Sequence, residues 1–203
     1  MPAPPPDPSP ATLAILAGGE GSRMGIPKAE LLLDGRPILH AILDRLDWPG
    51  PTLLVTAPGR ERPPGAERFS RECVDPVAGH GPLRGLLTAL EHAPTPWLVV
   101  TAVDMPLVRR EQLAWLVAAL KNTPGAAGLL TTRPQVEPFP SAFHRDFAAK
   151  VVRGALSSGR RALHALLDEP SIQSVPTPAD WPPETWTNLN RPQDLDALGA
   201  ASR

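Results

Sequence analysis

A glycine-rich segment with two cations follows the first apolar run of the chain. That run, Thr12–Ala17, leads into four glycines within eight residues, and Arg23 and Lys28 lie in the same segment. Glycines permit positive φ angles and close backbone approach, so consecutive N–H groups can converge on an anion. Lys28 is one of only three lysines in the sequence. The pattern predicts a phosphate-binding loop at the end of a strand.

Two common phosphate-binding motifs do not fit this loop. A Walker A loop needs Ser or Thr directly after its Gly-Lys pair, whereas here Pro27 precedes Lys28 and Ala29 follows it. A dinucleotide fingerprint needs its third glycine where this chain has Met24. A plain structural turn would account for one or two glycines, but not for four glycines and two cations.

Asp104 is the first candidate carboxylate. It follows the apolar run Trp97–Thr101 and is clamped by Met105-Pro106. Magnesium takes hard oxygen ligands, often one or two carboxylates together with substrate phosphates, so a single well-held Asp is adequate. The alternative is that Asp104 caps the helix expected to begin near Arg110.

Asp75 is the second candidate carboxylate, in the segment VDPVAGHGPLRG that spans residues 74–85. Guanine presents adjacent N1–H and N2–H donors, and a carboxylate accepts from both. On a loop near a base pocket Asp75 would therefore select guanine, and Gly81 would let the chain pass close to the ligand. By sequence alone, Asp75 fits a turn before Pro76 equally well.

The elements around these residues alternate between strand and helix. Strands are expected at 12–17, 52–56, 97–101, 126–132 and 172–175, an extended piece at 138–143, and a short strand or core piece at 31–33. Helices are expected at about 38–46, 82–91, 110–120, 145–155, 160–167 and 192–198, with a loop at 57–71. This order predicts an α/β fold with a mostly parallel sheet covered on both faces, and ligands at the carboxyl ends of its strands.

Composition excludes several classes of protein. The 203 residues include 28 prolines but are 42% hydrophobic, which predicts one core in a single domain over 11–203, behind a disordered Pro-rich tail at 1–10. A net charge of −1 and no membrane-length apolar run predict neither a nucleic-acid partner nor a membrane partner. One cysteine, Cys73, excludes a disulfide scaffold, and with no leader sequence in view it favours the cytoplasm.

The loop LAGGEGSRMGIPK resembles the L-A-G-G-x-x-S-R-M-G-x-x-K signature of nucleotidyltransferases, and more narrowly that of the molybdenum cofactor guanylyltransferases. VDMPL, GPLRG and TNLNRPQDL are similar to further motifs of that family. The resemblance implies a three-layer Rossmann-like (GT-A-like) fold. It implies nucleotide-binding roles for Leu16, Ala17, Gly18, Gly19, Lys28, Asp75, Gly81 and Asp104, catalytic roles for Lys28, Arg23 and Asp104, a metal site at Asp104, and acceptor binding by Asn188 and Asn190. The two asparagines could instead complete the metal shell, and capping of a last helix is an equal alternative to both roles.

The chain departs from the family pattern at several positions. Pro27 stands where the family usually has Asp, Phe139 where it has Leu, and Arg191 where it has Thr. The family also commonly carries an Asn after the second strand, but here the stretch is TAPGR, and no residue of it is assigned that role.

The resemblance implies transfer of GMP from GTP to the terminal phosphate of molybdopterin carrying molybdenum, with Mg²⁺ or Mn²⁺ as cofactor. It also allows transient contacts with other proteins of cofactor biosynthesis. The acceptor already attacks through a phosphate anion, so positioning and charge neutralisation suffice without a protein base. Two alternatives remain at this stage: a cytidylyl- or sugar-phosphate nucleotidyltransferase with the same loop, and a non-catalytic nucleotide-binding protein.

Overall fold

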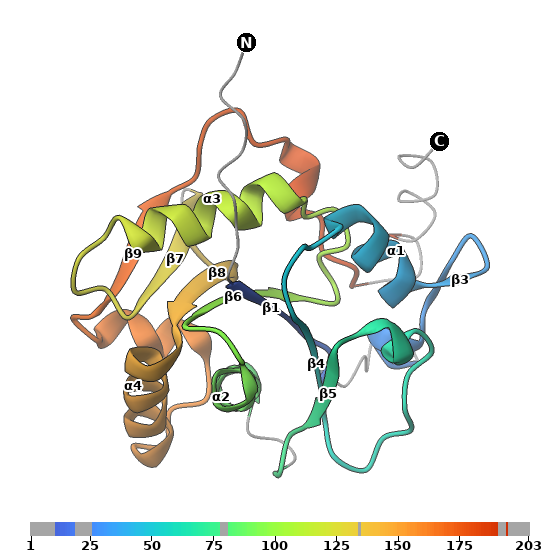
Figure 1. Ribbon diagram of the computed structural model, residues 1–203, viewed down its shortest axis with the longest axis horizontal. Coiled ribbons are helices and arrows are strands. Elements are labelled where there is room, and N and C mark those ends of the chain that lie inside the picture. The colour runs from blue at the N-terminus through green and yellow to red at the C-terminus, as the bar shows by residue number, and fades with distance from the viewer. Residues whose placement is uncertain (1–10, 19–25, 78–80, 134, 191–193, 195–203) are drawn as a thin grey trace.

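A seven-stranded sheet lies between two layers of helices in the computed structural model, which describes residues 11–18, 26–77, 81–133, 135–190 and 194 (Figure 1). The strands of this sheet are β1 (Ala11–Leu16), β4 (Thr52–Thr56), β5 (Arg71–Val74), β6 (Trp97–Ala102), β7 (Gly128–Arg133), β8 (Gln135–His144) and β9 (Ile172–Pro176). The α-helices are α1 (Ile38–Leu46), α2 (Gly81–His92), α3 (Arg110–Lys121) and α4 (Arg145–Ser157). Four 3₁₀ helices, η1 (Lys28–Glu30), η2 (Ala66–Arg68), η3 (Leu163–Asp168) and η4 (Pro183–Trp186), and a hairpin of β2 (Leu32–Leu33) and β3 (Arg36–Pro37) complete these described parts.

The strand order is β5-β4-β1-β6-β8-β7-β9, and β8 is antiparallel to both of its neighbours. The remaining pairs, β1 with β4 and β6, β4 with β5, and β7 with β9, are parallel. The mostly parallel sheet is therefore confirmed. Because β1, β4, β5 and β6 run side by side in one direction, the segments that follow them emerge at one edge of the sheet.

The central strands are buried on both faces, which explains why they appear in the sequence as continuous apolar runs. All six residues of β1 and all five of β4 are buried. Helices α1 and α3 cover one face of the sheet, and α2 and α4 cover the other (Figure 1). This is the layered arrangement expected of a parallel sheet.

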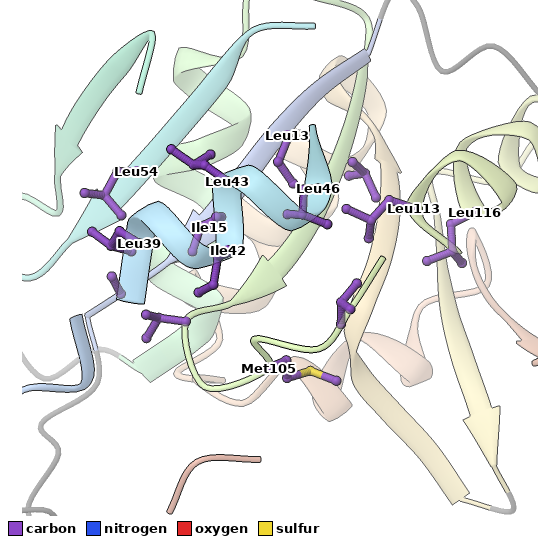
Figure 2. Packing of buried hydrophobic residues seen from close by; sticks show 14 of the residues in the cluster. Leu13, Ile15, Leu39, Ile42, Leu43, Leu46, Leu54, Met105, Leu113 and Leu116 are labelled. Atoms are coloured by element: carbon purple, nitrogen blue, oxygen red, sulfur yellow. The ribbon is translucent and has the colours of Figure 1, made fainter. Parts of the chain in front are cut away.

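Figure 2 shows the core on the α1 and α3 face: leucines of α1 lie over Leu13, Ile15 and Leu54 of β1 and β4, and Leu113 and Leu116 of α3 continue the same cluster to one side. In α1 the buried positions recur with helical spacing, and Ile42 and Leu46 lie one turn apart. The helix ends at Asp47, whose φ of 37° is left-handed, shortly before Pro49. This packing fixes α1 across one face of the sheet, and Trp48, just after the helix, donates to Ala11 O at the start of β1.

Two local features differ from the sequence-based expectations. The segment 57–71, expected to be a loop, contains η2 and leads into the unpredicted edge strand β5. The helix expected at 160–167 is the 3₁₀ helix η3. Of the two alternatives for 31–33, the short strand is confirmed, because Leu32 and Leu33 form β2 of the β2–β3 hairpin. The expected tail at 1–10 and closing helix at 192–198 lie outside the described residues, apart from Asp194. Within the described ranges, no helix combines the length and the apolar character needed to cross a bilayer.

Candidate functional site

Three predicted site residues from distant parts of the chain meet at the carboxyl edge of the sheet. The Lys28 ammonium donates to Asp104 Oδ2 over 2.9 Å and to Asn190 Oδ1 over 3.1 Å. The Lys28 and Asp104 side chains are 15% and 29% exposed, so both are partly shielded and still open to a ligand. A cation, a carboxylate and an amide are thus gathered within hydrogen-bond distance of one another.

The backbone at Pro27 explains how Lys28 is positioned. Pro27 has φ −57° and ψ 136°, and its carbonyl accepts from Glu30 N over 2.9 Å to close the first turn of η1. Proline fixes φ near this value, so the residue that replaces the usual Asp of the family is unstrained. The departure therefore leaves Lys28 in a regular turn that directs it to Asp104.

Asp104 is held from both sides by backbone hydrogen bonds. Just before it, Val103 N donates to Leu16 O over 3.1 Å and extends the β1–β6 ladder, while Asp104 O accepts from Leu189 N over 2.8 Å. The capping alternative does not describe Asp104, because the start of α3 is closed by Arg109 N donating to Gln112 Oε1 over 2.8 Å. Asp104 is instead fixed with its carboxylate on Lys28.

Asp75 follows β5 and lies against α2. Its backbone N–H donates to Thr56 O over 2.9 Å at the end of β4, and its Oδ1 accepts from the Thr88 hydroxyl. Burial raises the pKa of Asp75, while the Thr88 hydrogen bond and the positive charge of Arg84 act in the opposite direction and lower it. Asp75 is thus half buried and held at Oδ1, and among the described residues no hydrogen bond to its Oδ2 is found.

Gly81 begins α2 with φ +71°, which favours glycine over any other residue. A Cβ at this position would lie 2.8 Å from the Arg161 carbonyl oxygen, which also accepts from Leu83 N over 3.2 Å. The close approach that the structure explains is therefore to the chain near Arg161. The predicted contact of Gly81 with nucleotide stays a prediction.

The beginning of the predicted phosphate loop follows β1 directly. Ala17 N donates to Val55 O over 2.8 Å, and a Cβ on Gly18 would lie 3.6 Å from Ala57 N. Leu16, Ala17 and Gly18 thus end the central strand beside the end of β4. Gly19 and Arg23 lie outside the described residues.

The segment that carries Asn188 and Asn190 is anchored to α3. Buried Thr185 accepts a 2.6 Å hydrogen bond from the Gln112 amide, and Leu189 is fully buried between the two exposed asparagines. Asn190 reaches Lys28 through its side chain, and its backbone N–H donates to Asp194 Oδ2 over 2.8 Å. Asn190 therefore joins the site, and Asn188 lies two residues away from it.

The donor set suits a hard cation held jointly with substrate. Among the described residues, no group of three or more His, Cys, Asp or Glu side chains forms a metal cluster. Asp104 offers a partly exposed carboxylate with Lys28 on Oδ2, and Asn190 adds an amide oxygen nearby. One carboxylate with substrate phosphates is a usual arrangement for Mg²⁺, so the residues fit that ion.

Comparison with protein families decides the affiliation of the chain. Residues 13–173 match the family model of the MobA-like NTP transferase domain. The chain belongs to this family. It is accordingly a nucleotidyltransferase, and the sequence-based prediction of an enzyme with this layered α/β fold is confirmed.

Individual relatives of this transferase agree with the family match. It is 35% identical to a Deinococcus radiodurans protein named "Probable molybdenum cofactor guanylyltransferase", over 93% of this chain and 94% of the relative. It is 31% identical to the molybdenum cofactor guanylyltransferase of Vibrio cholerae, over 95% and 93% of the two chains. Molybdopterin-guanine dinucleotide biosynthesis protein A from Archaeoglobus fulgidus superposes with a TM-score of 0.78 at 26% identity, over 94% and 98%.

The fold is shared with transferases of other specificity. A 2-C-methyl-D-erythritol 4-phosphate cytidylyltransferase from Thermus thermophilus superposes with a TM-score of 0.69 at 21% identity, over 95% of this chain and 98% of that one. At that identity the likeness shows the fold alone. The choice of base in this transferase must therefore be argued from its own side chains.

Sequence reasoning missed two residues next to Asp75. Thr88 donates to its carboxylate, and Arg84 is close enough to lower its pKa. Both lie on α2, four residues apart, so they share a helix face with Gly81 and Gly85. Helical spacing from the GPLRG motif could have identified them once Asp75 was suspected to face α2.

Proposed function

We propose that this transferase moves GMP from GTP to the terminal phosphate of molybdopterin carrying molybdenum, and releases pyrophosphate. The contact of Lys28 with both Asp104 and Asn190 carries the proposal, because it joins the predicted phosphate, metal and acceptor residues in one place. The names of the Deinococcus radiodurans and Vibrio cholerae relatives support the choice of reaction.

Lys28 neutralises charge on the departing pyrophosphate. Its ammonium is fixed at the sheet edge where β1 ends in Leu16, Ala17 and Gly18. Preorganised donors and cations of this kind stabilise the charge that develops on phosphate oxygens in the transition state. Arg23 adds a second cation to this role.

Asp104 holds the divalent cation, Mg²⁺ with Mn²⁺ as the alternative. Bound there, the cation would neutralise part of the charge on the substrate phosphates. The carboxylate is kept in position by the backbone hydrogen bonds at Val103 and Leu189, so it does not have to reorganise when substrate arrives. Lys28 moves from Asp104 to the triphosphate when the site fills.

Asp75 selects the base. Its carboxylate accepts from N1–H and N2–H of guanine, a pair of adjacent donors that cytosine and adenine lack. Thr88 donates to one carboxylate oxygen and so restricts the rotation of the group. GTP is bound with its base at the end of β5 and its phosphates at Lys28.

Asn190 and Asn188 bind the acceptor. Asn190 touches Lys28, so the acceptor phosphate and the α-phosphorus of GTP are brought together by neighbouring side chains. The attacking oxygen belongs to a phosphate anion, and its in-line approach needs positioning more than proton removal.

The test is pyrophosphate release by the purified protein with GTP, Mg²⁺ and molybdenum-loaded molybdopterin. We expect release that needs all three additions, falls when CTP replaces GTP, and is lost in Asp104→Asn. A preference for CTP would replace the base assignment with a cytidylyltransferase. Tight GTP binding without any release would support the non-catalytic alternative and contradict the proposal.

A further inference from the structure

Arg84 lies on the face of α2 that packs against Asp75. The Thr88 hydroxyl donates to Asp75 Oδ1, and a Cβ placed on Gly85 would lie 3.6 Å from Asp75 Oδ2. Arg84 precedes Gly85 and lies one helical turn before Thr88, so it projects from the same face. Its positive charge lowers the pKa of the Asp75 carboxyl, although burial, the larger effect, raises it.

The Arg84 guanidinium has an unsatisfied donor. Its Nε is buried, and it has no hydrogen-bond partner among the residues that the structure describes. Arg84 forms no ion pair with Asp75 there either, although the two side chains are close enough to interact electrostatically. A buried charged donor without an acceptor is costly, so its position beside Asp75 indicates a ligand that supplies the acceptor.

Guanine has an acceptor in the required place. Along its Watson–Crick edge, O6, N1–H and N2–H follow one another, and in the proposed function the last two groups face Asp75. The O6 atom then lies beside the carboxylate, where a guanidinium N–H can donate to it. An adenine placed the same way would direct an amino group at Arg84, and a cytosine would turn an unprotonated ring nitrogen toward Asp75.

We propose that Arg84 donates to O6 of guanine, so that Arg84 and Asp75 together determine the choice of GTP. This inference rests on the proposed function, because it takes the base to be bound at Asp75. Arg84 is then a specificity residue rather than a catalytic one, since it touches the base and not the reacting phosphates. Its loss weakens GTP binding about 10- to 100-fold, the usual effect of one hydrogen bond from a charged donor.

The test compares ligands that differ at a single atom or group of the base. Binding of GTP, 6-thio-GTP and ITP is measured by calorimetry with Mg²⁺ for the wild-type protein, Arg84→Met and Arg84→Lys. 6-Thio-GTP keeps both donors but carries a weak sulfur acceptor in place of O6, and ITP keeps O6 but lacks the N2 donor. Met preserves the buried stem of the side chain, and Lys preserves its charge.

We expect the wild-type protein to bind GTP more tightly than 6-thio-GTP. Arg84→Met should lose that preference, because only its affinity for GTP falls. The loss of affinity from GTP to ITP, which reports on Asp75, should be the same in the wild-type protein and Arg84→Met. Arg84→Lys should recover part of the GTP affinity. Arg153→Met is the matched control, because Arg153 is an exposed arginine that pairs with Glu91 near the other end of α2. It should change none of these affinities.

Two results separate this inference from the proposed function. Equal weakening of GTP and 6-thio-GTP in Arg84→Met, or no weakening of either, would overturn the role of Arg84 while GTP binding and transfer by the wild-type protein stand. A wild-type protein that binds CTP in preference to GTP would overturn both. Thermal unfolding of each variant shows whether a loss of affinity reflects a loss of fold.

Discussion

Lys28 and Asp104 form an ion pair of 2.9 Å across 76 residues of sequence, at the edge where β1 and β6 end. Without substrate, the positive charge of Lys28 and the negative charge of Asp104 neutralise each other. With substrate, Lys28 is suited to phosphate oxygens and Asp104 to a metal cation. A pair this exposed contributes at most about 1 kcal/mol to stability, so phosphate and metal can replace it at little cost. The ion pair therefore keeps both side chains in place without closing the site.

Replacing Lys28 tests this arrangement. In the proposed reaction Lys28→Ala removes the cation that faces the leaving group, so we expect kcat for GMP transfer to fall by about 10²- to 10³-fold, as for other preorganised transition-state contacts. The melting temperature should change little, because the ion pair is partly exposed. Pyrophosphate release and thermal unfolding measure the two effects.

Lys28→Arg is the control, since it keeps the charge but changes the geometry, and it should retain more activity than Lys28→Ala. Unchanged turnover in Lys28→Ala would remove this residue from the mechanism. A large fall in melting temperature would instead show that the ion pair is structural.

Asp104→Asn should separate metal binding from the local fold. The amide oxygen can still accept from Lys28, so the backbone around residue 104 should stay in place. The loss of negative charge weakens the binding of Mg²⁺. We expect the Mg²⁺ concentration for half-maximal activity to rise at least about tenfold, with thermal unfolding nearly unchanged. Addition of EDTA to the wild-type protein should abolish transfer, and transfer that survives EDTA would contradict a metal role for Asp104.

The adjacency of Lys28 and Asp104 could be predicted, because both follow buried strands whose carboxyl ends meet in a parallel sheet. The contact with Asn190 could not be predicted, since its segment has no periodic pattern and is positioned by the buried Thr185 and Leu189. Strand β5 was missed because Cys73 is the only one of its four residues that is buried. An edge strand of this kind has too few inward positions to give a pattern.

The β2–β3 hairpin had a signal that sequence reasoning did not use. Asp34 and Gly35 both have positive φ angles, and Asp-Gly between two short extended pieces is a common hairpin turn. The contacts of Asp75 with α2 depend instead on how β5 and α2 pack together. A single sequence predicts which residues share a face of α2, but not which element that face packs against.

Gly81→Ala should destabilise the protein for two separable reasons. The left-handed backbone costs about 1 kcal/mol for a residue with a Cβ, and the Cβ would also lie 2.8 Å from the Arg161 carbonyl oxygen. Gly35→Ala is the matched control, because Gly35 has φ +75° with no atom within 4 Å of the added Cβ. Chemical denaturation should show a larger loss of unfolding free energy for Gly81→Ala than for Gly35→Ala. Equal losses would mean that the chain near Arg161 moves away from the added Cβ without cost.

Thr185→Val should loosen the segment that carries the two asparagines. It leaves the buried Gln112 amide without its acceptor, which costs about 1–3 kcal/mol of unfolding free energy. We expect KM for the acceptor to rise while KM for GTP stays constant, because Asn190 lies on this segment and Asp75 does not. Adding Gln112→Leu should cost less than the sum of the two single changes, since the two groups form one hydrogen bond. Steady-state kinetics and denaturation measure these effects, and a rise in both KM values would contradict a role confined to the acceptor.

Asp75→Asn should lower the affinity for GTP and raise the stability of the protein relative to wild type, by an amount that depends on pH. Burial raises the pKa of Asp75 above its ordinary value of 3.8, so between the two values the folded protein holds a proton that the unfolded chain has released. The contribution of Asp75 to the free energy of unfolding is thus most favourable below pH 3.8 and is lost as pH rises through the folded pKa.

In Asp75→Asn the amide still accepts from Thr88 but does not titrate. The contributions of the other titratable groups are the same in the variant and the wild type, so they cancel when the two are compared. The variant should therefore gain stability relative to wild type as pH rises from about 4 toward 7, while its GTP affinity at pH 7 falls about 10- to 100-fold. Denaturation across this range and calorimetric titration with GTP provide the measurement, and a stability difference that stays constant with pH would show that burial does not perturb this carboxylate.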